Sequence, residues 1–260
     1  MPADPHVYDS DRLARCYAHS RPPVHDVICA RLFAALPAGC EVRFALDIGC
    51  GAGSSTAPLV AQARNVMGID PYLPMLRQAR RRLPMPTFVQ ATAGALPAKT
   101  ASMDLVTAAG SLNYTDIDAS LAEAARVLAP NGHLAVYDFS TGRVLPRDAP
   151  SESGFLSFEQ RFPRLRGYPM DLARLPYDAH GLALTFFDTF VVEIGMSVDE
   201  YLDYVMSETN VEAAISGGLS EPDARHACRE IFGPLFAGGS RTVGFSSVLA
   251  LAGQVGRRDI

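Results

Sequence analysis

Two kinds of hydrophobic pattern alternate along the chain, and together they predict the fold. In the first kind, apolar residues recur at helical spacing, as Val24, Ile28 and Leu32 do within residues 23–36. In the second kind, short apolar runs bounded by glycine or polar residues are typical of buried strands. Strands are predicted over 44–49, 65–70, 87–91, 103–110 and 132–140, and helices over 23–36, 54–63, 72–83 and 117–129. This alternation predicts a parallel sheet with helices on both faces.

The pattern changes after Ser140. Residues 141–180 are rich in proline, glycine, arginine and aromatic residues, and only 155–162 resemble a helix. Because the phenylalanines of this stretch need something to pack against, we interpret it as an insertion or lid rather than a linker. Beyond it, the sequence predicts a strand over 182–194, helices over 197–206 and 221–232, and a last edge strand over 241–253.

Composition narrows the possible functions. The 260 residues are 48% hydrophobic and 20% charged, which is typical of a soluble globular protein. The net charge of −5 argues against nucleic acid or anionic membrane as a partner. The five cysteines include no CxxC pair, so we predict neither a metal site nor a disulfide framework. The first residues are unlike a signal peptide and no apolar run could span a bilayer, so we expect a cytoplasmic protein.

The stretch LDIGCGAGSST, residues 46–56, joins the first predicted strand to a helix. Such a glycine-rich turn lets backbone N–H groups approach a ligand closely. A dinucleotide-binding turn would carry its third glycine where this chain has Ser54, which argues against a nicotinamide cofactor. Asp70, at the end of the second strand, can accept hydrogen bonds from a ribose diol, and Asp47 can meet a positive group. The pair favours a ligand that carries both an ammonium group and a ribose.

Four successive motifs resemble those of the class I methyltransferases that use S-adenosylmethionine (SAM). They are ALDIGCGAGSST, GIDPYLPMLRQAR, ATAGALPAKTASMDLVTAAGSLNY and SLAEAARVLAPNGHLAVYDFS, and the resemblance covers about residues 15–140. YAHSRPP (17–23) and SMDLVTAAGSLNY further resemble the branch that includes trans-aconitate methyltransferases and, more distantly, quinone-biosynthetic methyltransferases. The resemblance implies a Rossmann-like α/β fold, a seven-stranded sheet with helices on both faces, an N-terminal helical arm and a lid insertion.

This family resemblance also implies a domain organisation. We expect one methyltransferase domain over residues 1–260. Its expected parts are the N-terminal arm (1–36), the SAM-binding core (37–140), the lid insertion (141–180) and a C-terminal part that completes the sheet and covers the substrate (181–260).

The same resemblance implies which residues contact SAM. Asp47 and the turn at 49–53 would hold its amino-acid end, Asp70 its ribose, and Tyr17 and Arg21 its carboxylate. The complete set of implied cofactor-binding residues is Tyr17, Arg21, Asp47, Gly49, Cys50, Gly51, Gly53, Asp70, Pro71, Met75, Thr92, Ala93, Ala109, Gly110 and Ser111. Cys50 is expected to be a small buried residue of the turn, without thiol chemistry.

Two positions depart from the family's pattern. Thr92 stands where the family has an acidic residue for the adenine amino group, so adenine binding would rely on Thr92 or on main chain. Asn113 and Tyr114 stand where the narrower branch has His-Trp, so a base must come from elsewhere. The candidate catalytic residues are His19, Asn113 and Tyr114, and the candidate substrate-binding residues are Asn113, Tyr114 and Arg143.

Because Asn113 stands where the narrower branch has histidine, the sequence favours one class of acceptor over others. A carboxylate needs no base at neutral pH, whereas a phenol or carbon acid does, so the sequence slightly favours a carboxylate or another oxygen nucleophile of a small molecule. The alternatives are non-methyl chemistry on this fold, such as a cyclisation, and a non-catalytic binding module. Nicotinamide-dependent oxidoreduction is a third, which the glycine spacing weakens. The identity of the acceptor and the oligomeric state are left open.

Overall fold

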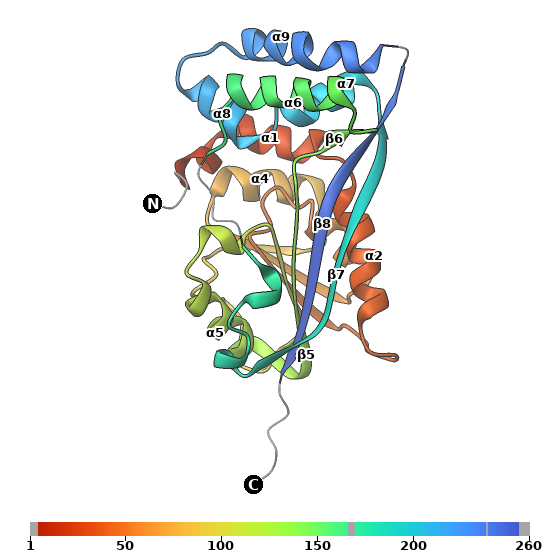
Figure 1. Ribbon diagram of the computed structural model, residues 1–260. Helices are drawn as coiled ribbons and strands as arrows, with labels where there is room; N and C mark the ends of the chain where they lie inside the picture. Colours follow the sequence, from red (N-terminus) through yellow and green to blue (C-terminus); the bar gives the residue numbers. More distant parts are fainter. Residues whose placement is uncertain (1–4, 166–169, 238, 255–260) are drawn as a thin grey trace.

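A twisted sheet topped by a layer of helices makes up the computed structural model, which describes residues 5–165, 170–237 and 239–254 (Figure 1). The strands are β1 (Phe44–Ile48), β2 (Asn65–Asp70), β3 (Thr87–Gln90), β4 (Met103–Ala109), β5 (Leu128–Phe139), β6 (Arg143–Val144), β7 (Leu182–Met196) and β8 (Arg241–Gln254). Strands β3-β2-β1-β4-β5 pair in parallel in that order. Strand β8 then pairs antiparallel with β5, β7 and the short β6. The predicted α/β sheet is confirmed.

The prediction that the last strand lies at the edge is wrong. Strand β8 lies between β5 and β7, and β7 forms the edge of the sheet opposite to β3. Side chains on both faces of β8 are buried, Phe245 and Leu251 on one face and Ala250 and Ala252 on the other, which suits an interior strand. Strand β7 instead alternates between exposed and less exposed positions, and its Phe187 and Val191 remain exposed. That alternation is the pattern of a strand with one solvated face.

Helices cover both faces of the sheet, and the alternation of side chains along each strand explains why. On one face Ala45 and Leu105 pack with helix α2 (Val24–Ala35) and helix α3 (Thr56–Val60). On the other face Leu46 and Val106 pack with helix α5 (Ile117–Val127). Helix α4 (Leu73–Arg82) packs beside β3. Both faces of the parallel strands therefore bury apolar residues, as the continuous runs predicted.

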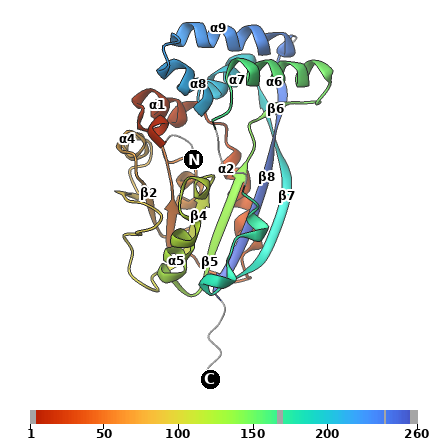
Figure 2. The same cartoon turned by 60° about the vertical axis from the view of Figure 1, so that its left-hand side comes forward.

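A second layer of helices lies across the carboxyl ends of the parallel strands (Figures 1 and 2). We call this layer the cover; it consists of α1 (Asp11–Ser20), α6 (Ala149–Arg161), α7 (Val198–Val205), α8 (Thr209–Ser216) and α9 (Glu221–Phe232). Buried aromatic rings join its helices, with Phe158 and Tyr201 both against Phe232. The helix predicted at 155–162 begins earlier, because the Asp148 carboxylate caps the first turn at Ser151. The phenylalanines of the insertion thus pack within the cover.

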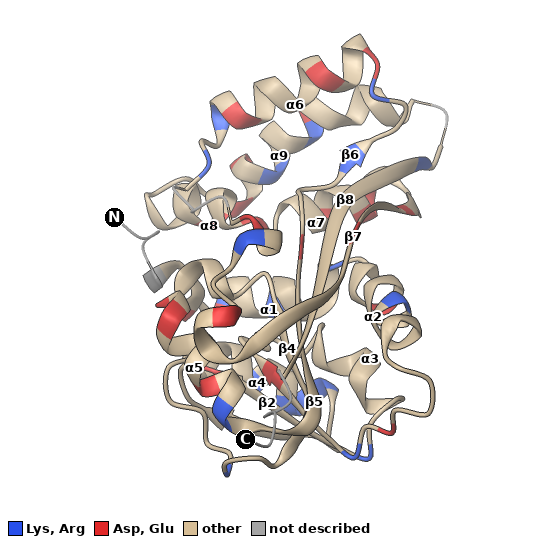
Figure 3. Cartoon of the chain, turned by 60° about the horizontal axis from the view of Figure 1, so that its bottom comes forward, with Lys and Arg blue, Asp and Glu red and all other residues tan. Residues whose placement is uncertain are grey.

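Single turns of 3-10 helix complete the described chain. They are η1 (Pro5–Asp9), η2 (Leu112–Tyr114), η3 (Leu172–Arg174), η4 (Asp178–His180) and η5 (Gly233–Phe236). Charges on the cover are mixed, and Figure 3 shows positive and negative residues side by side on α6 and its neighbours. None of the helices within the described ranges has the length and apolarity needed to cross a membrane.

Candidate functional site

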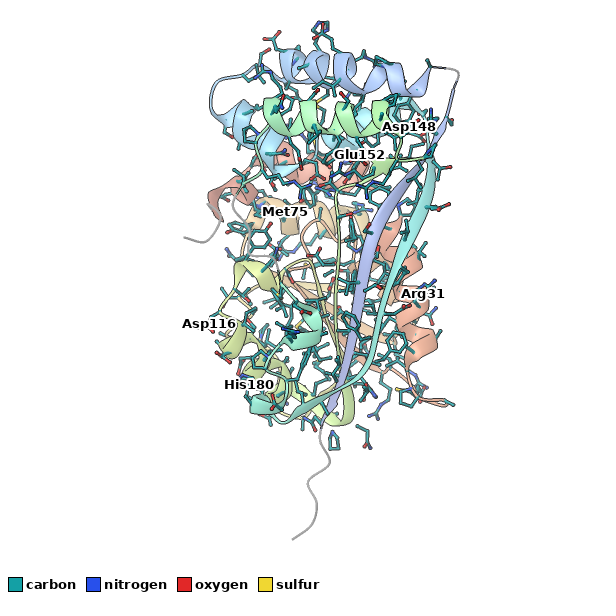
Figure 4. All side chains as sticks on the ribbon, viewed as in Figure 1. Arg31, Met75, Asp116, Asp148, Glu152 and His180 are labelled. Atoms are coloured by element: carbon teal, nitrogen blue, oxygen red, sulfur yellow. The ribbon has the colours of Figure 1, made fainter. Side chains whose placement is uncertain are left out.

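A cavity of about 1120 Å³ lies between the carboxyl ends of the strands and the cover. Parallel α/β sheets bind their ligands at this end. In Figure 4, Met75 lies at the boundary between sheet and cover, and it lines the cavity. The predicted site residues that line it are Tyr17, Arg21, Gly49, Gly51, Asp70, Pro71, Met75, Thr92, Ala93, Ala109, Gly110, Ser111, Asn113 and Tyr114. Most residues assigned from the sequence are thus brought together in one place.

The glycine turn after β1 is built from backbone conformations that side chains rarely adopt. Gly49 and Gly51 have φ angles of +68° and +53°. A Cβ at Gly49 would collide with the Ser111 side chain, so glycine here allows β1 and β4 to approach each other. A Cβ at Gly51 would meet nothing within 4 Å, because this residue faces the cavity. The turn therefore presents bare backbone to a ligand at Gly51.

Asp70 joins this turn to the end of β2. Its Oδ2 accepts a hydrogen bond from the Gly51 N–H at 3.0 Å, and its Oδ1 accepts one from the Tyr72 N–H at 2.9 Å. Burial raises the pKa of Asp70 to about 6, against the opposing effect of these two N–H groups. Each carboxylate oxygen keeps a second lone pair, and the residue lines the cavity. Asp70 can therefore accept hydrogen bonds from a ligand diol while it holds the turn.

Asp47 supports the turn from behind and does not line the cavity. Its fully buried carboxylate accepts hydrogen bonds from the hydroxyls of Ser55, Thr56 and Thr107 at 2.7–2.8 Å. Burial raises the pKa of Asp47 and the three hydroxyls oppose that rise. Ser55 and Thr56 belong to the hydroxyl run that follows the glycines, whereas the third partner, Thr107, comes from β4.

Two more residues of the turn lie behind the cavity wall. Cys50 is buried against Leu76 and Phe88, and a Cβ at Gly53 would approach the Leu83 side chain to 3.1 Å. The structure therefore places Cys50 and Gly53, like Asp47, where they shape the turn from the protein side.

The N-terminal arm contributes Tyr17 and Arg21 to the cavity. The Arg21 guanidinium lies 4.1 Å from the centroid of the Tyr17 ring, donates to the Ser207 carbonyl at 2.9 Å and pairs with Glu208 at 3.1 Å. Its Nε is buried and has no hydrogen-bond acceptor among the described residues. A buried donor without a partner is costly, so Arg21 is suited to an anionic ligand group such as a carboxylate.

The far side of the cavity is formed by the segments that follow β3 and β4. Thr92 and Ala93 come from the first segment, and Gly110, Asn113 and Tyr114 from the second. The Asn113 Oδ1 is buried without a hydrogen-bond partner among the described residues. The Tyr114 hydroxyl accepts a hydrogen bond at 3.1 Å from the hydroxyl of Tyr8, which also lines the cavity. This side thus offers backbone, amide and phenol groups to a ligand.

Besides Asp47, Cys50 and Gly53, two further predicted residues, Arg143 and His19, are not brought to the cavity. The Arg143 guanidinium lies 3.2 Å from the centroid of the Phe155 ring and pairs with Glu152, which lies within the upper helical layer in Figure 4. His19 is exposed, and its Nδ1 is 2.8 Å from the Arg15 carbonyl oxygen. Both side chains are held by neighbours within the arm or the cover.

Sequence reasoning missed several ionisable groups that do line the cavity, among them His25, Asp138, Arg164 and Glu208. Asp138 carried a signal, because it is an acidic residue directly after the apolar run of β5, at the end of a strand where ligands bind. The other three gave none, since their approach to the cavity depends on how the cover packs.

Part of the chain is similar in sequence to known methyltransferases. Residues 46–136 match the family described as Methyltransferase domain. Over 110 residues the chain is 41% identical to trans-aconitate 2-methyltransferase of Methylobacterium nodulans, covering 41% of this chain and 42% of the relative. Over 96 residues it is 38% identical to demethylmenaquinone methyltransferase of Renibacterium salmoninarum, covering 36% and 40%. The matches span about two fifths of the length of these curated relatives.

A solved structure matches most of the chain. A protein from Anaeromyxobacter dehalogenans, assigned to the type II methyltransferases, aligns with a TM-score of 0.63 at 23% identity, covering 88% of this chain and 96% of that protein. This likeness confirms the predicted fold, and the sequence matches confirm the resemblance drawn from the motifs.

Proposed function

We propose that this chain, which carries a domain of the class I SAM-dependent methyltransferase family, transfers the methyl group of SAM to an oxygen nucleophile of a small molecule. The observation that carries the proposal is the arrangement around Asp70. The Asp70 carboxylate accepts a hydrogen bond from the N–H of Gly51, the residue of the turn that faces open space. Asp70 also lines the same cavity as most of the other residues that the family resemblance assigns to the cofactor.

The residues present fit SAM at each of its ends. Asp70 accepts hydrogen bonds from the ribose diol, and Gly51 leaves room for the methionine portion. The unpartnered Nε of Arg21 is available to the methionine carboxylate. Pro71, Met75 and Thr92 line the part of the cavity left for adenine.

When bound, SAM supplies a methyl group that its sulfonium already activates. The protein's own residues then have to align the acceptor in line with the bond that breaks, and exclude water. The cover excludes water, because α1 and α8 lie over the cavity and are linked by the Arg12–Glu212 ion pair. Alignment falls to the end of the cavity that Asn113, Asp138 and Thr189 line.

Two measurements test this function. Calorimetry with SAM and with S-adenosylhomocysteine (SAH) should give binding by the wild-type chain that Asp70→Asn weakens. Incubation with methyl-labelled SAM and a library of small hydroxyl compounds and acids should give labelled product. NAD binding without SAM binding would contradict the proposal. Product formed from a substrate without transfer of label would favour the alternative of non-methyl chemistry.

A further inference from the structure

The carboxylate of Asp138 stands at the end of β5, beside the end of β4. An added Cβ at Gly110 would lie 3.0 Å from the Asp138 Oδ1, so the carboxylate lies directly over that glycine. Both residues line the cavity. The family resemblance also implies that Gly110 presents its backbone beside the sulfonium of SAM. Asp138 is therefore next to the place where an acceptor atom has to arrive.

No cation among the described residues neutralises Asp138. Its Oδ1 accepts the Phe139 N–H at 2.8 Å, and its Oδ2 has no donor in the described part of the chain. The two arginines that line the cavity are already paired, Arg21 with Glu208 and Arg164 with Glu159. This end of the cavity therefore presents a free negative charge to the acceptor.

The Asn113 side chain provides a second oxygen that needs a hydrogen-bond donor. The buried Oδ1 of Asn113 accepts no hydrogen bond from any described residue, and Asn113 lines the same cavity. A buried acceptor without a donor is destabilising, so the Asn113 oxygen calls for a ligand that donates. The half-buried Asp138 carboxylate lines the same cavity and can accept a hydrogen bond from that ligand through its Oδ2. An O–H group meets this need, whereas a carboxylate brings only further acceptors and a second negative charge beside Asp138.

We propose that Asp138 is the catalytic base for an uncharged hydroxyl acceptor, a phenol or alcohol, whose proton it takes as the methyl group is transferred. This inference rests on the proposed function and narrows its acceptor class. The acceptor oxygen forms a bond to the methyl carbon while the carbon–sulfur bond breaks and leaves its electron pair on sulfur. The hydroxyl proton passes to the Asp138 Oδ2 and then to solvent, so charge and atoms balance.

The environment of Asp138 suits this role. Burial raises the pKa of the Asp138 carboxyl, against the opposing effect of the Phe139 N–H. A carboxylate with a raised pKa is a stronger base and still loses its proton more readily than a phenol. This explains how the chain does without the His-Trp pair of the narrower branch.

Another possible base in the cavity is His25 on α2. Its Nδ1 is 3.0 Å from the Tyr137 hydroxyl, and burial lowers the pKa of the imidazole to about 3. So low a pKa makes His25 a poor proton acceptor at neutral pH. The remaining ionisable groups that line the cavity are Asp70 on β2, Tyr72 after β2, Tyr8, Tyr17 and Arg21 of the arm, Tyr114 and Asp116 after β4, Arg164, and Glu208 before α8.

The test compares Asp138→Asn with Asp118→Asn, which removes an exposed carboxylate that pairs with His180 outside the cavity. With SAH bound, we expect the wild type to bind phenol more tightly than benzoate. Asp138→Asn should bind benzoate at least tenfold more tightly than the wild type does, because the repulsion is gone. Asp118→Asn should match the wild type for both probes, and SAH affinity should stay within about twofold in all three proteins.

The second readout is methyl transfer to catechol at saturating SAM. We expect kcat of Asp138→Asn to fall by about 10²–10⁴-fold, the usual contribution of a general base. Its remaining rate should keep rising with pH as catechol ionises, whereas the wild-type rate should level off. Asp138→Ser, which keeps an acceptor for the Phe139 N–H, provides a second variant if the first does not fold.

Three results would overturn the assignment. They are tighter binding of benzoate than of phenol by the wild type, an unchanged kcat in Asp138→Asn, and a loss of activity in His25→Gln equal to that in Asp138→Asn. Failure of the wild type to bind SAH would instead overturn the proposed function.

Discussion

The strand ends and the cover hold their cavity residues by different means. At the strand ends the backbone decides the geometry, because Gly51 has a positive φ angle and Asp70 is fixed by two backbone N–H groups. In the cover, long side chains decide it, as in the pairs of Arg21 with Glu208 and of Arg12 with Glu212. The first kind of position depends on local sequence and the second on partners almost two hundred residues away.

The family match follows the same division. Residues 46–136 contain the turn, Asp70 and the ends of β2 and β4, and they contain none of the cover. The part of the cavity that the proposed function assigns to SAM therefore lies in the segment that the chain shares with its relatives. Asp138 and Arg164 line the same cavity and lie outside the matched segment. Under the proposed function, acceptor choice thus depends in part on residues beyond the shared segment.

The largest expected effect tests how the cover is held. In Arg12→Met the Glu212 carboxylate, whose side chain is 4% exposed, loses its main cation. An uncompensated buried charge costs about 3 kcal/mol of unfolding free energy, measured by urea denaturation. The double variant Arg12→Met with Glu212→Leu should recover most of this loss, since it leaves no unpaired charge. Equal stability of the single variant and the wild type would mean that the pair does not hold the cover.

The next effect tests the turn. Gly51→Val puts a branched side chain into the cavity at a φ of +53°, and we expect SAM affinity to fall by at least about 100-fold, near 3 kcal/mol. Gly39→Val is the matched control, because Gly39 also has a positive φ and open space but lies outside the cavity. It should lose a similar amount of stability and keep its SAM affinity by calorimetry. Equal affinities in the two variants would contradict the placement of the methionine portion at Gly51.

A smaller effect concerns charge at the ribose position. Asp70→Asn should weaken SAM binding by about 1–3 kcal/mol, because the diol loses a charged acceptor. The pKa of Asp70 is raised to about 6, so the carboxylate is ionised above that pH and protonated below it. Wild-type affinity should therefore fall as the pH drops through about 6, and the affinity of Asp70→Asn should stay flat there. A flat wild-type profile by calorimetry would argue against Asp70 as the ribose acceptor.

The same two kinds of position explain which parts of the fold could be predicted from the sequence. Strands β1–β4 were predicted within about one residue, because an apolar run between turn residues leaves little choice. Strand β8 was misplaced at the edge because strand order depends on pairing between distant segments. The apolar composition of β8 agrees with burial of both its faces, but the composition alone does not identify the strands that cover its two edges.

The same distinction separates the site residues that could be predicted from those that could not. Gly51 and Asp70 could be assigned because their roles follow from local backbone geometry. The buried position of Asp47 could not, since Thr107, one of its three hydroxyl partners, comes from another strand. Arg164 was missed because a long side chain in an insertion gains its direction from tertiary packing alone.

The smallest expected effect concerns Arg143, which lies within the cover and outside the cavity. The Arg143 guanidinium lies over the Phe155 ring and near Glu152, outside the cavity, so Arg143→Met should lower stability by at most about 1 kcal/mol. Its KM and kcat for the acceptor should stay within about twofold of wild type. Arg164→Met, which removes a charge that lines the cavity, should change KM for the same acceptor. A large rise in KM for Arg143→Met with kcat intact would mean that Arg143 reaches the acceptor, and that the cover repacks when the acceptor binds.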